Sequence, residues 1–247
     1  HQVPSFINNV VNKKGTVARI YLPPDANCLL SVVDHCLKSR DYVNLIVASK
    51  QMIPQWLDMD AAREHCVRGT SVWAWASNDG GTPDVVLAAA GDVPTEEVVA
   101  AAGLLRSELP ELLVRVVNVV DLFTLISHHD HPHGLDDVAF VDLFTEDKPV
   151  IFAFHGYPRL IHELVYHRPN PSRFHVHGYI EEGRTTIPFD MLVLNKMSRY
   201  HLAIAALHRA TRLRSRAGGI IDKFEERLAA HRVYIREHDG DLPEILN

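Results

Sequence analysis

The chain has 247 residues, of which 47% are hydrophobic and 23% are charged, and its net charge is −6. At this length folding buries roughly 70–75% of the surface of the unfolded chain. This composition excludes an intrinsically disordered, a collagen-like and a disulfide-scaffold protein. No uninterrupted apolar run approaches the ~20 residues of a membrane-spanning helix, and the acidic charge balance argues against a nucleic-acid partner.

Short apolar runs alternate with segments of helical periodicity along the whole chain. The runs predict β-strands at 17–21, 43–48, 85–90, 113–120, 150–154 and 174–180. The run at 43–48 is apolar throughout, which is typical of a strand covered on both faces. The run at 174–180 alternates between polar and apolar residues, which suits an edge strand.

Helical periodicity predicts helices at 26–38, at 55–67, from 94 onward, and at 136–144, 198–213 and 220–238. Asp25 or Asn27 is expected to cap the first helix. Gly218-Gly219 is expected to separate the last two. The first helix carries one broad apolar face, made of Leu29, Leu30, Val33, Cys36 and Leu37.

Strands that alternate with helices predict βαβ units, and therefore an α/β fold with a mostly parallel sheet. Right-handed crossovers place helices on both faces of such a sheet. The loop at 77–83 (SNDGGTP) is expected to be the most flexible point. Strands flank it on both sides, so it is not expected to be a domain boundary.

The spacing of the cysteines bears on the redox compartment of the chain, and the local charge bears on its partners. Cys28, Cys36 and Cys66 are an odd number without paired short spacing, which favours buried thiols in a reducing compartment over a zinc site. Residues 196–238 hold ten Lys/Arg against four Asp/Glu, a local charge of +6. We interpret this stretch as a solvated helix end, with a surface for an acidic partner as the alternative.

Histidines supply several candidate groups. The run HHDHPH at 128–133 suggests either a metal site or a polar loop, and Pro132 favours the loop because it prevents the ligands from sharing one helix face. His155 directly follows a predicted strand, where parallel sheets bind ligands, although a structural histidine is equally consistent. His175 and His177 share a strand face, either as a ligand pair or as an exposed edge pair.

Lys50 also lies just past a predicted strand, where a lysine can reach a phosphate as a point charge; a solvated surface lysine is the alternative. The sequence contains no G-x-x-x-x-G-K-[ST], G-x-G-x-x-G or G-x-S-x-G motif. From the residues alone we therefore expect an α/β domain with weak hints of anion binding and no catalytic core of its own.

Several longer motifs resemble the C-terminal part of the phosphoketolases, which are thiamine-diphosphate enzymes. In chain order the motifs are YLPPDAN (21–27), AGDVPT (90–95), RVVNVVDL (115–122), DKPVIFAFHGY (147–157) and TIPFDM (186–191). The resemblance implies a fold similar to the C-terminal domain of transketolase, a three-layer α/β/α sandwich with a mostly parallel sheet and C-terminal helices. It also implies that 1–247 is one such domain, with 1–14 as a tail of the preceding domain or a linker and 196–247 as a helical extension.

The resemblance carries over two site residues, both as contacts to the substrate phosphate. His1 matches the last histidine of the family motif H-N-G-F-[ST]-H-Q, and Lys50 matches the lysine of V-A-[GS]-K-Q. No catalytic, metal-binding or cofactor-binding residue is expected in this chain. The chain begins with His1 rather than Met, so we expect a processed product, a fragment or a trimmed form of a protein.

The family is a group of carbon–carbon lyases that cleave xylulose 5-phosphate or fructose 6-phosphate with inorganic phosphate, giving acetyl phosphate and an aldose phosphate. The resemblance implies that thiamine diphosphate and Mg²⁺ are bound by N-terminal domains absent from this chain, in a cytoplasmic homodimer without nucleic-acid or membrane partners. The domain alone is expected to be inactive, and to contribute phosphate contacts and dimer assembly.

Two other functions stay open from the sequence. One is a stand-alone regulatory module of the same fold that binds an anion or a nucleotide. The other is a metalloprotein built on the histidine run at 128–133. Nucleotide titration and elemental analysis, respectively, would test them.

Overall fold

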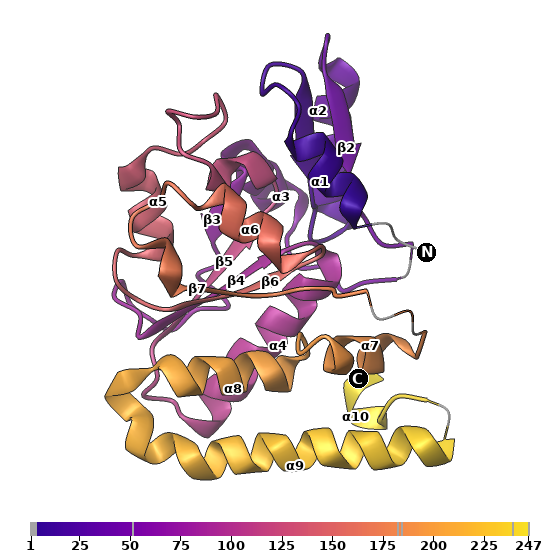
Figure 1. Ribbon diagram of the computed structural model, residues 1–247, viewed down its shortest axis with the longest axis vertical. Coiled ribbons are helices and arrows are strands. Elements are labelled where there is room, and N and C mark those ends of the chain that lie inside the picture. Colours follow the sequence, from indigo (N-terminus) through magenta and orange to yellow (C-terminus); the bar gives the residue numbers. More distant parts are fainter. Residues whose placement is uncertain (1–3, 51, 182, 184, 239, 247) are drawn as a thin grey trace.

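The computed structural model describes residues 4–50, 52–181, 183, 185–238 and 240–246. Its strands form a two-stranded sheet near the N-terminus and a five-stranded sheet in the body of the protein (Figure 1). The strands are β1 (Ala18–Tyr21), β2 (Val43–Ile46), β3 (Thr70–Val72), β4 (Val85–Ala90), β5 (Val114–Val119), β6 (Val150–Phe154) and β7 (Phe174–His177). The α-helices are α1 (Ser5–Val11), α2 (Ala26–Lys38), α3 (Met59–Arg68), α4 (Asp92–Glu108), α5 (Asp137–Phe144), α6 (Pro158–Leu164), α7 (Pro188–Leu194), α8 (Arg199–Arg209), α9 (Arg214–His238) and α10 (Pro243–Leu246).

The larger sheet has the strand order β3-β5-β4-β6-β7. Strands β4 to β7 are parallel, and β3 joins the edge of β5 in the antiparallel direction. The three central strands are buried along their whole length, as their apolar sequences predict for strands covered on both faces. The position of β7 at the other edge confirms the expectation drawn from its alternating sequence.

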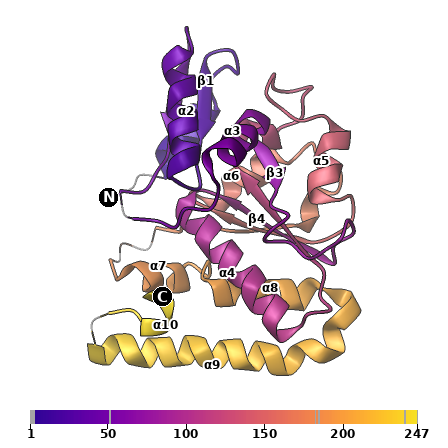
Figure 2. The same ribbon diagram turned by 180° about the vertical axis from the view of Figure 1, so that it is seen from behind.

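Helices cover both faces of this sheet. Alternate residues of β4 point to opposite sides: Val85, Leu87 and Ala89 join the core formed with α4, α8 and α9. The intervening residues join the core formed with α1, α5 and α6. The expected three-layer α/β/α sandwich is therefore confirmed, and Figure 2 shows α4 and α8 on one side of the sheet with α9 outside them.

The expected break at Gly218-Gly219 is wrong, because α9 runs through both glycines. A glycine inside a helix costs roughly 0.5–1 kcal/mol relative to alanine. Burial of Ala217, Phe224 and Leu228 in the core offsets this cost. The chain turns earlier, in a short 3₁₀ segment at Thr211–Leu213.

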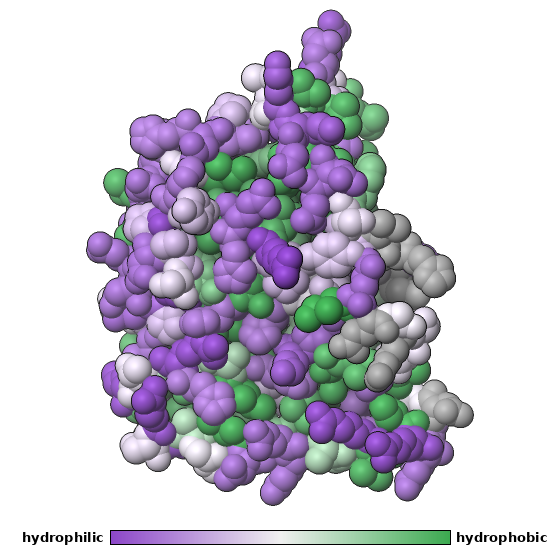
Figure 3. Space-filling model, in the orientation of Figure 1, coloured by the Kyte–Doolittle hydropathy of each residue, from purple (hydrophilic) through white to green (hydrophobic). Residues whose placement is uncertain are grey.

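The first two predicted strands do not join the main sheet, which corrects the expectation of a single sheet. They pair with each other in parallel, and β2 is only half-buried although its sequence predicted cover on both faces. Figure 3 shows hydrophobic atoms at the surface of the upper right part, where Figure 1 places α2 and β2. Asp25 caps α2 as expected, by accepting a hydrogen bond from the backbone N–H of Cys28 at 2.8 Å.

The loop expected to be the most flexible is held by Arg115 of β5. The guanidinium donates to the carboxylate of Asp79 at 2.8 and 3.0 Å and to the carbonyl of Gly81 at 2.7 Å. It also donates to the carbonyl of Asp142 at 2.7 Å. Charge-assisted bonds of this kind are stronger than neutral ones, so Arg115 fastens the loop to the sheet.

Across the described ranges, no helix is long and apolar enough to span a bilayer. Short helices α1, α6, α7 and α10 and strand β3 were not anticipated from the sequence. Each is too short for periodicity to reveal it against its neighbours.

Candidate functional site

The connections of the main sheet change direction between β4 and β6. From β4 the chain crosses through α4 to β5 on one side, and from β6 it crosses through α6 to β7 on the other. Ligands of open α/β sheets bind at the carboxyl ends of the strands where such a reversal occurs. The residues at this point are Gly91 and Asp92 after β4, and His155 and Gly156 after β6.

Gly91 permits the close approach of the two strand ends. Its φ of +107° lies in a region that residues with a side chain rarely adopt. A Cβ atom at this position would lie 2.5 Å from the Cβ of His155. The glycine therefore allows His155 to lie directly against the start of α4.

Asp92 is the first residue of α4 and is only 3% exposed. Its carboxylate accepts hydrogen bonds from the backbone N–H of Val93 at 2.7 Å and from the backbone N–H of Ser49. A carboxylate is favoured at a helix N-terminus, where the backbone N–H groups and the helix dipole are positive. Asp92 thus fastens the segment after β2 to the switch point of the main sheet.

His155 lies beside this carboxylate, with its Nδ1 atom 3.6 Å from Oδ1 of Asp92, and is 4% exposed. Its ring also meets the ring of Tyr179 edge-on, with centroids 5.4 Å apart. Burial lowers the pKa of His155, although the charge of Asp92 acts in the opposite direction. Burial raises the pKa of Tyr179 to about 12. Both side chains are therefore neutral near pH 7.

The structure describes only one of the two residues that the family resemblance selects as phosphate contacts. Lys50 is exposed and follows Ser49, so the bond from Ser49 to Asp92 brings the Lys50 segment to the switch point. His1 lies outside the described residues. The structure thus joins the motif of Lys50 with AGDVPT and with FHGY, although they are far apart in sequence.

Asp92 was missed as a site residue, although one signal could have found it. It is an acidic residue one position after a buried strand, preceded by glycine and followed by a helix start. Its partner Ser49 lies 43 positions away, and no local pattern reports that contact.

The histidine run at 128–133 is dispersed among separate partners. His133 Nδ1 lies 2.9 Å from a carboxylate oxygen of Asp121, and the ring of His131 stacks on Phe123 with centroids 4.1 Å apart. Asp130 is bonded to His167 at 2.8 Å. Over the described ranges, no group of three or more His, Cys, Asp or Glu side chains is placed to hold a metal ion.

The histidines of β7 are half-buried rather than exposed. His177 donates from Nδ1 to the carbonyl of Lys196 at 2.7 Å, and burial lowers the pKa of His175 to about 4. These surroundings are those of structural side chains. The cysteines are free thiols, with Cys28 buried and the other two partly buried.

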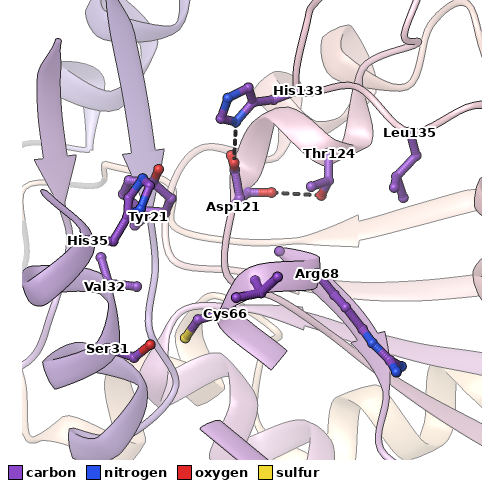
Figure 4. Close-up of a pocket in the computed structure, with 12 residues that line it drawn as sticks. Tyr21, Ser31, Val32, His35, Cys66, Arg68, Asp121, Thr124, His133 and Leu135 are labelled. Carbon is purple, nitrogen blue, oxygen red and sulfur yellow. Dashed lines mark hydrogen bonds and ion pairs between the residues drawn. The ribbon is translucent and has the colours of Figure 1, made fainter. Parts of the chain in front are cut away.

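A cavity of about 380 Å³ lies between the N-terminal sheet and the body of the protein. Tyr21 and His35 line one wall, and Asp121, Thr124 and His133 line the other (Figure 4). Arg68 points away from these side chains and pairs with Glu64 at 2.5 Å. Among the described residues that line the cavity, no arginine side chain points into it, and the sequence analysis did not anticipate this cavity.

Five of the ten Lys and Arg residues at 196–238 form ion pairs within the described part of the chain. Arg212 pairs with Asp84, Arg216 with Glu111, Lys223 with Glu108, Arg227 with Glu244, and Arg199 with the buried Glu97. Cations that already have carboxylate partners offer little to an anionic ligand. The exposed pairs themselves contribute about 0–1 kcal/mol each to stability.

Comparisons with known proteins agree with the motifs. Residues 50–247 match the family model of the XFP C-terminal domain. Residues 1–39 match that of D-xylulose 5-phosphate/D-fructose 6-phosphate phosphoketolase. A probable phosphoketolase of Rhodopseudomonas palustris (strain HaA2) is 60% identical over 99% of this chain and 31% of its own length. A probable phosphoketolase 2 of Rhizobium meliloti (strain 1021) is 60% identical over the whole chain and 32% of its own. The chain thus spans about a third of the length of these curated relatives.

Solved structures share the fold at low sequence identity. A transketolase from Leishmania mexicana superposes with a TM-score of 0.58 at 14% identity, over 86% of this chain and 28% of that one. A split gene transketolase described as an inactive beta4 tetramer gives 0.57 at 16% identity, over 78% and 58% respectively. At these identities the likeness concerns the fold alone.

Proposed function

Since the chain belongs to the D-xylulose 5-phosphate/D-fructose 6-phosphate phosphoketolase family, we propose that it provides the phosphate-binding edge of a phosphoketolase. In this proposal the complete enzyme cleaves xylulose 5-phosphate or fructose 6-phosphate with inorganic phosphate, giving acetyl phosphate and an aldose phosphate. "Complete enzyme" here means a full-length phosphoketolase that carries this domain. The domain alone is proposed to be inactive.

The bond from Ser49 to Asp92 supports this proposal, because it holds the residue that precedes Lys50 at the reversal of the main sheet. An ammonium group there can bind the phosphate of a sugar as a point charge. Binding of the remote phosphate helps to align the reacting carbonyl elsewhere in the enzyme. Loss of such a charge-assisted contact costs about 1.5–3 kcal/mol, roughly ten- to hundredfold in affinity. His1 is proposed as a second phosphate contact on resemblance alone.

Thiamine diphosphate would supply the electron sink for carbon–carbon cleavage, with Mg²⁺ holding its diphosphate group. The described residues do not fit that pair. They contain no cluster of carboxylate, imidazole or thiolate ligands for a metal, and the sequence has no glycine-rich phosphate loop. We therefore propose that the cofactor and the metal are bound by the two thirds of the relatives that this chain does not match.

The remaining parts of the proposal follow the family. They are a homodimeric enzyme in the cytoplasm, with sugar phosphate and inorganic phosphate as its ligands. The domain organisation proposed is a C-terminal domain over 1–247, with 1–14 as a tail or linker and 196–247 as a helical extension. Half of the cations of the basic helices already have carboxylate partners, so we do not propose a separate nucleotide-binding role; nucleotide titration of the chain tests that point.

Kinetics of the complete enzyme test the role of Lys50. Replacing Lys50→Ala should raise KM for the sugar phosphate by roughly ten- to hundredfold, with a much smaller change in kcat. Lys223→Ala is the matched control, because Lys223 is also an exposed lysine but is paired with Glu108 on a distant helix. Unchanged kinetics in the Lys50 variant would refute the proposal.

A further inference from the structure

Two of the three cysteines are in contact where helices α2 and α3 pack together. The thiol of Cys66 on α3 donates to the carbonyl oxygen of Cys28 on α2, with the sulfur 3.6 Å from that oxygen. The thiol groups of Cys28 and Cys66 are also hydrogen-bonded to each other. The S–S bond of a disulfide is about 2.0 Å long, so only a small movement of the side chains separates this contact from a covalent bond.

The two thiols differ in their access to solvent. Cys28 is 0% exposed. Cys66 is only partly buried, and it lines the cavity between the N-terminal sheet and the body of the protein. Figure 4 shows the sulfur of Cys66 on the side of the cavity where Ser31 of α2 lies. A small solute can therefore reach Cys66 but not Cys28.

The surroundings also make Cys66 the more acidic of the two thiols. Hydrogen bonds with the thiol of Cys28 and the hydroxyl of Ser31 lower the pKa of Cys66, although burial acts in the opposite direction. The bond with Cys66 raises the pKa of Cys28, and burial raises it further. The thiolate rather than the thiol is the nucleophile. Acidity and access thus agree that Cys66 reacts first.

The third cysteine is not placed to join this pair. Cys36 lies eight positions after Cys28 on the same helix, which is roughly 12 Å along the helix axis. The Cα atoms of a disulfide are usually about 4.4–6.8 Å apart. Burial raises the pKa of Cys36, which lowers its thiolate fraction at neutral pH. The fold therefore selects one pair among three cysteines.

We propose that Cys28 and Cys66 form a reversible disulfide when a hydroperoxide reaches the cavity. In the first step the thiolate of Cys66 attacks an oxygen of the peroxide, so that an S–O bond forms and the O–O bond breaks. Cys66 becomes a sulfenic acid. The other peroxide oxygen leaves as water, or as an alcohol from an organic hydroperoxide, after it takes up the proton that Cys66 lost.

In the second step the sulfur of Cys28 attacks the sulfenic sulfur of Cys66. An S–S bond forms, the S–O bond breaks, and the hydroxide leaves as water with the proton of Cys28. The two thiols lose two electrons in all, and the peroxide accepts them. A dithiol reductant reverses the bond by thiol–disulfide exchange. Disulfides of reducing compartments are typically transient in this way.

The bond would close a loop that contains the Lys50 segment. This loop runs from Cys28 to Cys66 and includes β2. The carboxylate of Asp25 already joins two points of the loop, because it accepts from the backbone N–H of Cys28 at 2.8 Å and from that of Leu57 at 2.9 Å. A disulfide next to these bonds would restrain the same region covalently. The inference is independent of the proposed function, since it concerns the thiols alone.

Peptide mapping of the chain after treatment with hydrogen peroxide tests the proposal. We expect two of the three free thiols to disappear, with Cys28 and Cys66 recovered in one disulfide-linked pair of peptides. Dithiothreitol should restore all the thiols. Because the bond restricts the unfolded chain, the oxidised form should unfold at a Tm roughly 5–15 °C higher than the reduced form.

Variants of the single cysteines separate the two steps. Cys66→Ser should abolish the disulfide. Cys28→Ala should stop the reaction at the sulfenic acid of Cys66, which dimedone labels. Cys36→Ser is the matched control and should form the disulfide as the unchanged chain does. In urea, where the fold is lost, oxidation should instead favour the pair Cys28–Cys36, because the shorter loop closes more readily.

Several results would overturn the proposal. They are survival of all the thiols in the folded chain, oxidation of Cys66 to a sulfinic acid without a bond to Cys28, and recovery of Cys36 in the linked peptides. Disulfide-linked dimers on a non-reducing gel would also overturn it, because Cys66 would then react with another chain before Cys28. None of these readouts involves Lys50, so failure here and failure of the phosphate-binding proposal are distinguishable.

Discussion

The same substitution, glycine to alanine, should have opposite effects at two positions of one βα unit. Gly91 precedes α4 with φ +107° and ψ 158°. This conformation is essentially restricted to glycine and costs another residue on the order of 1–3 kcal/mol. The added Cβ would also lie 2.5 Å from the Cβ of His155, and neither atom can move by a side-chain rotation. Backbone shifts that relieve such overpacking cost typically about 1–3 kcal/mol more.

We therefore expect Gly91→Ala to lower the free energy of unfolding by roughly 2–6 kcal/mol. For a chain of this size this corresponds to a fall in Tm of roughly 5–20 °C. Gly103→Ala is the matched control. Gly103 lies inside α4, and nothing lies within 4 Å of its added Cβ. Alanine there should raise stability by roughly 0.5–1 kcal/mol.

Urea denaturation of the isolated chain measures both effects, with circular dichroism and tryptophan fluorescence as probes. Coincident transitions by the two probes establish that one cooperative unit is followed. A loss below about 1 kcal/mol for Gly91→Ala would show that the strand end relaxes freely. Shifts of the same sign in the two variants would refute the conformational argument altogether.

Three further predictions concern the site and its supports. In the complete enzyme, Asp92→Asn weakens the bond to Ser49 and should raise KM for the sugar phosphate about three- to tenfold. In the double variant KM should be no higher than in Lys50→Ala alone; additive effects on KM would show that the two residues act independently. Arg115→Met should lower the free energy of unfolding by about 3–5 kcal/mol, because Asp79 stays buried without its partner, and the added change Asp79→Asn should recover part of the loss in urea titrations. Burial lowers the pKa of His131 to about 4. Between pH 6.5 and 4 the folded state therefore binds fewer protons than the unfolded state, and the free energy of unfolding decreases as the pH falls. His131→Gln should make this decrease with pH less steep, and an unchanged slope would contradict the assignment.

Predictions from local sequence patterns were correct where the deciding interactions join residues that are close in sequence. The cap of α2 was predicted correctly because the carboxylate of Asp25 and the N–H of Cys28 are three residues apart. The run at 85–90 was predicted as a buried strand because uninterrupted apolar residues suit a strand between two helix layers. Lys50 and His155 were noticed because each follows such a strand. Their common neighbourhood could not be predicted from these positions alone.

The predictions were wrong where contacts between segments far apart in sequence determine the local structure. The pair Gly218-Gly219 reads locally as a helix break, but burial of Phe224 and Leu228 in the core maintains the helix. The run at 43–48 was predicted as a strand covered on both faces, yet β2 covers only Val43–Ile46 and is no more than half-buried. Apolar patterns report that a segment is to be covered, without reporting what covers it.

The sequence by itself determined the alternation of strands and helices, the α/β class and the family motifs, because hydrophobic periodicity and residue identity are properties of neighbouring positions. Only the tertiary structure decided that β1 and β2 leave the main sheet, that Asp92 meets Ser49, and that the reversal of the sheet lies between β4 and β6. Those outcomes depend on contacts between segments tens of residues apart. Their free energy comes from the fit of whole faces, which no local pattern encodes.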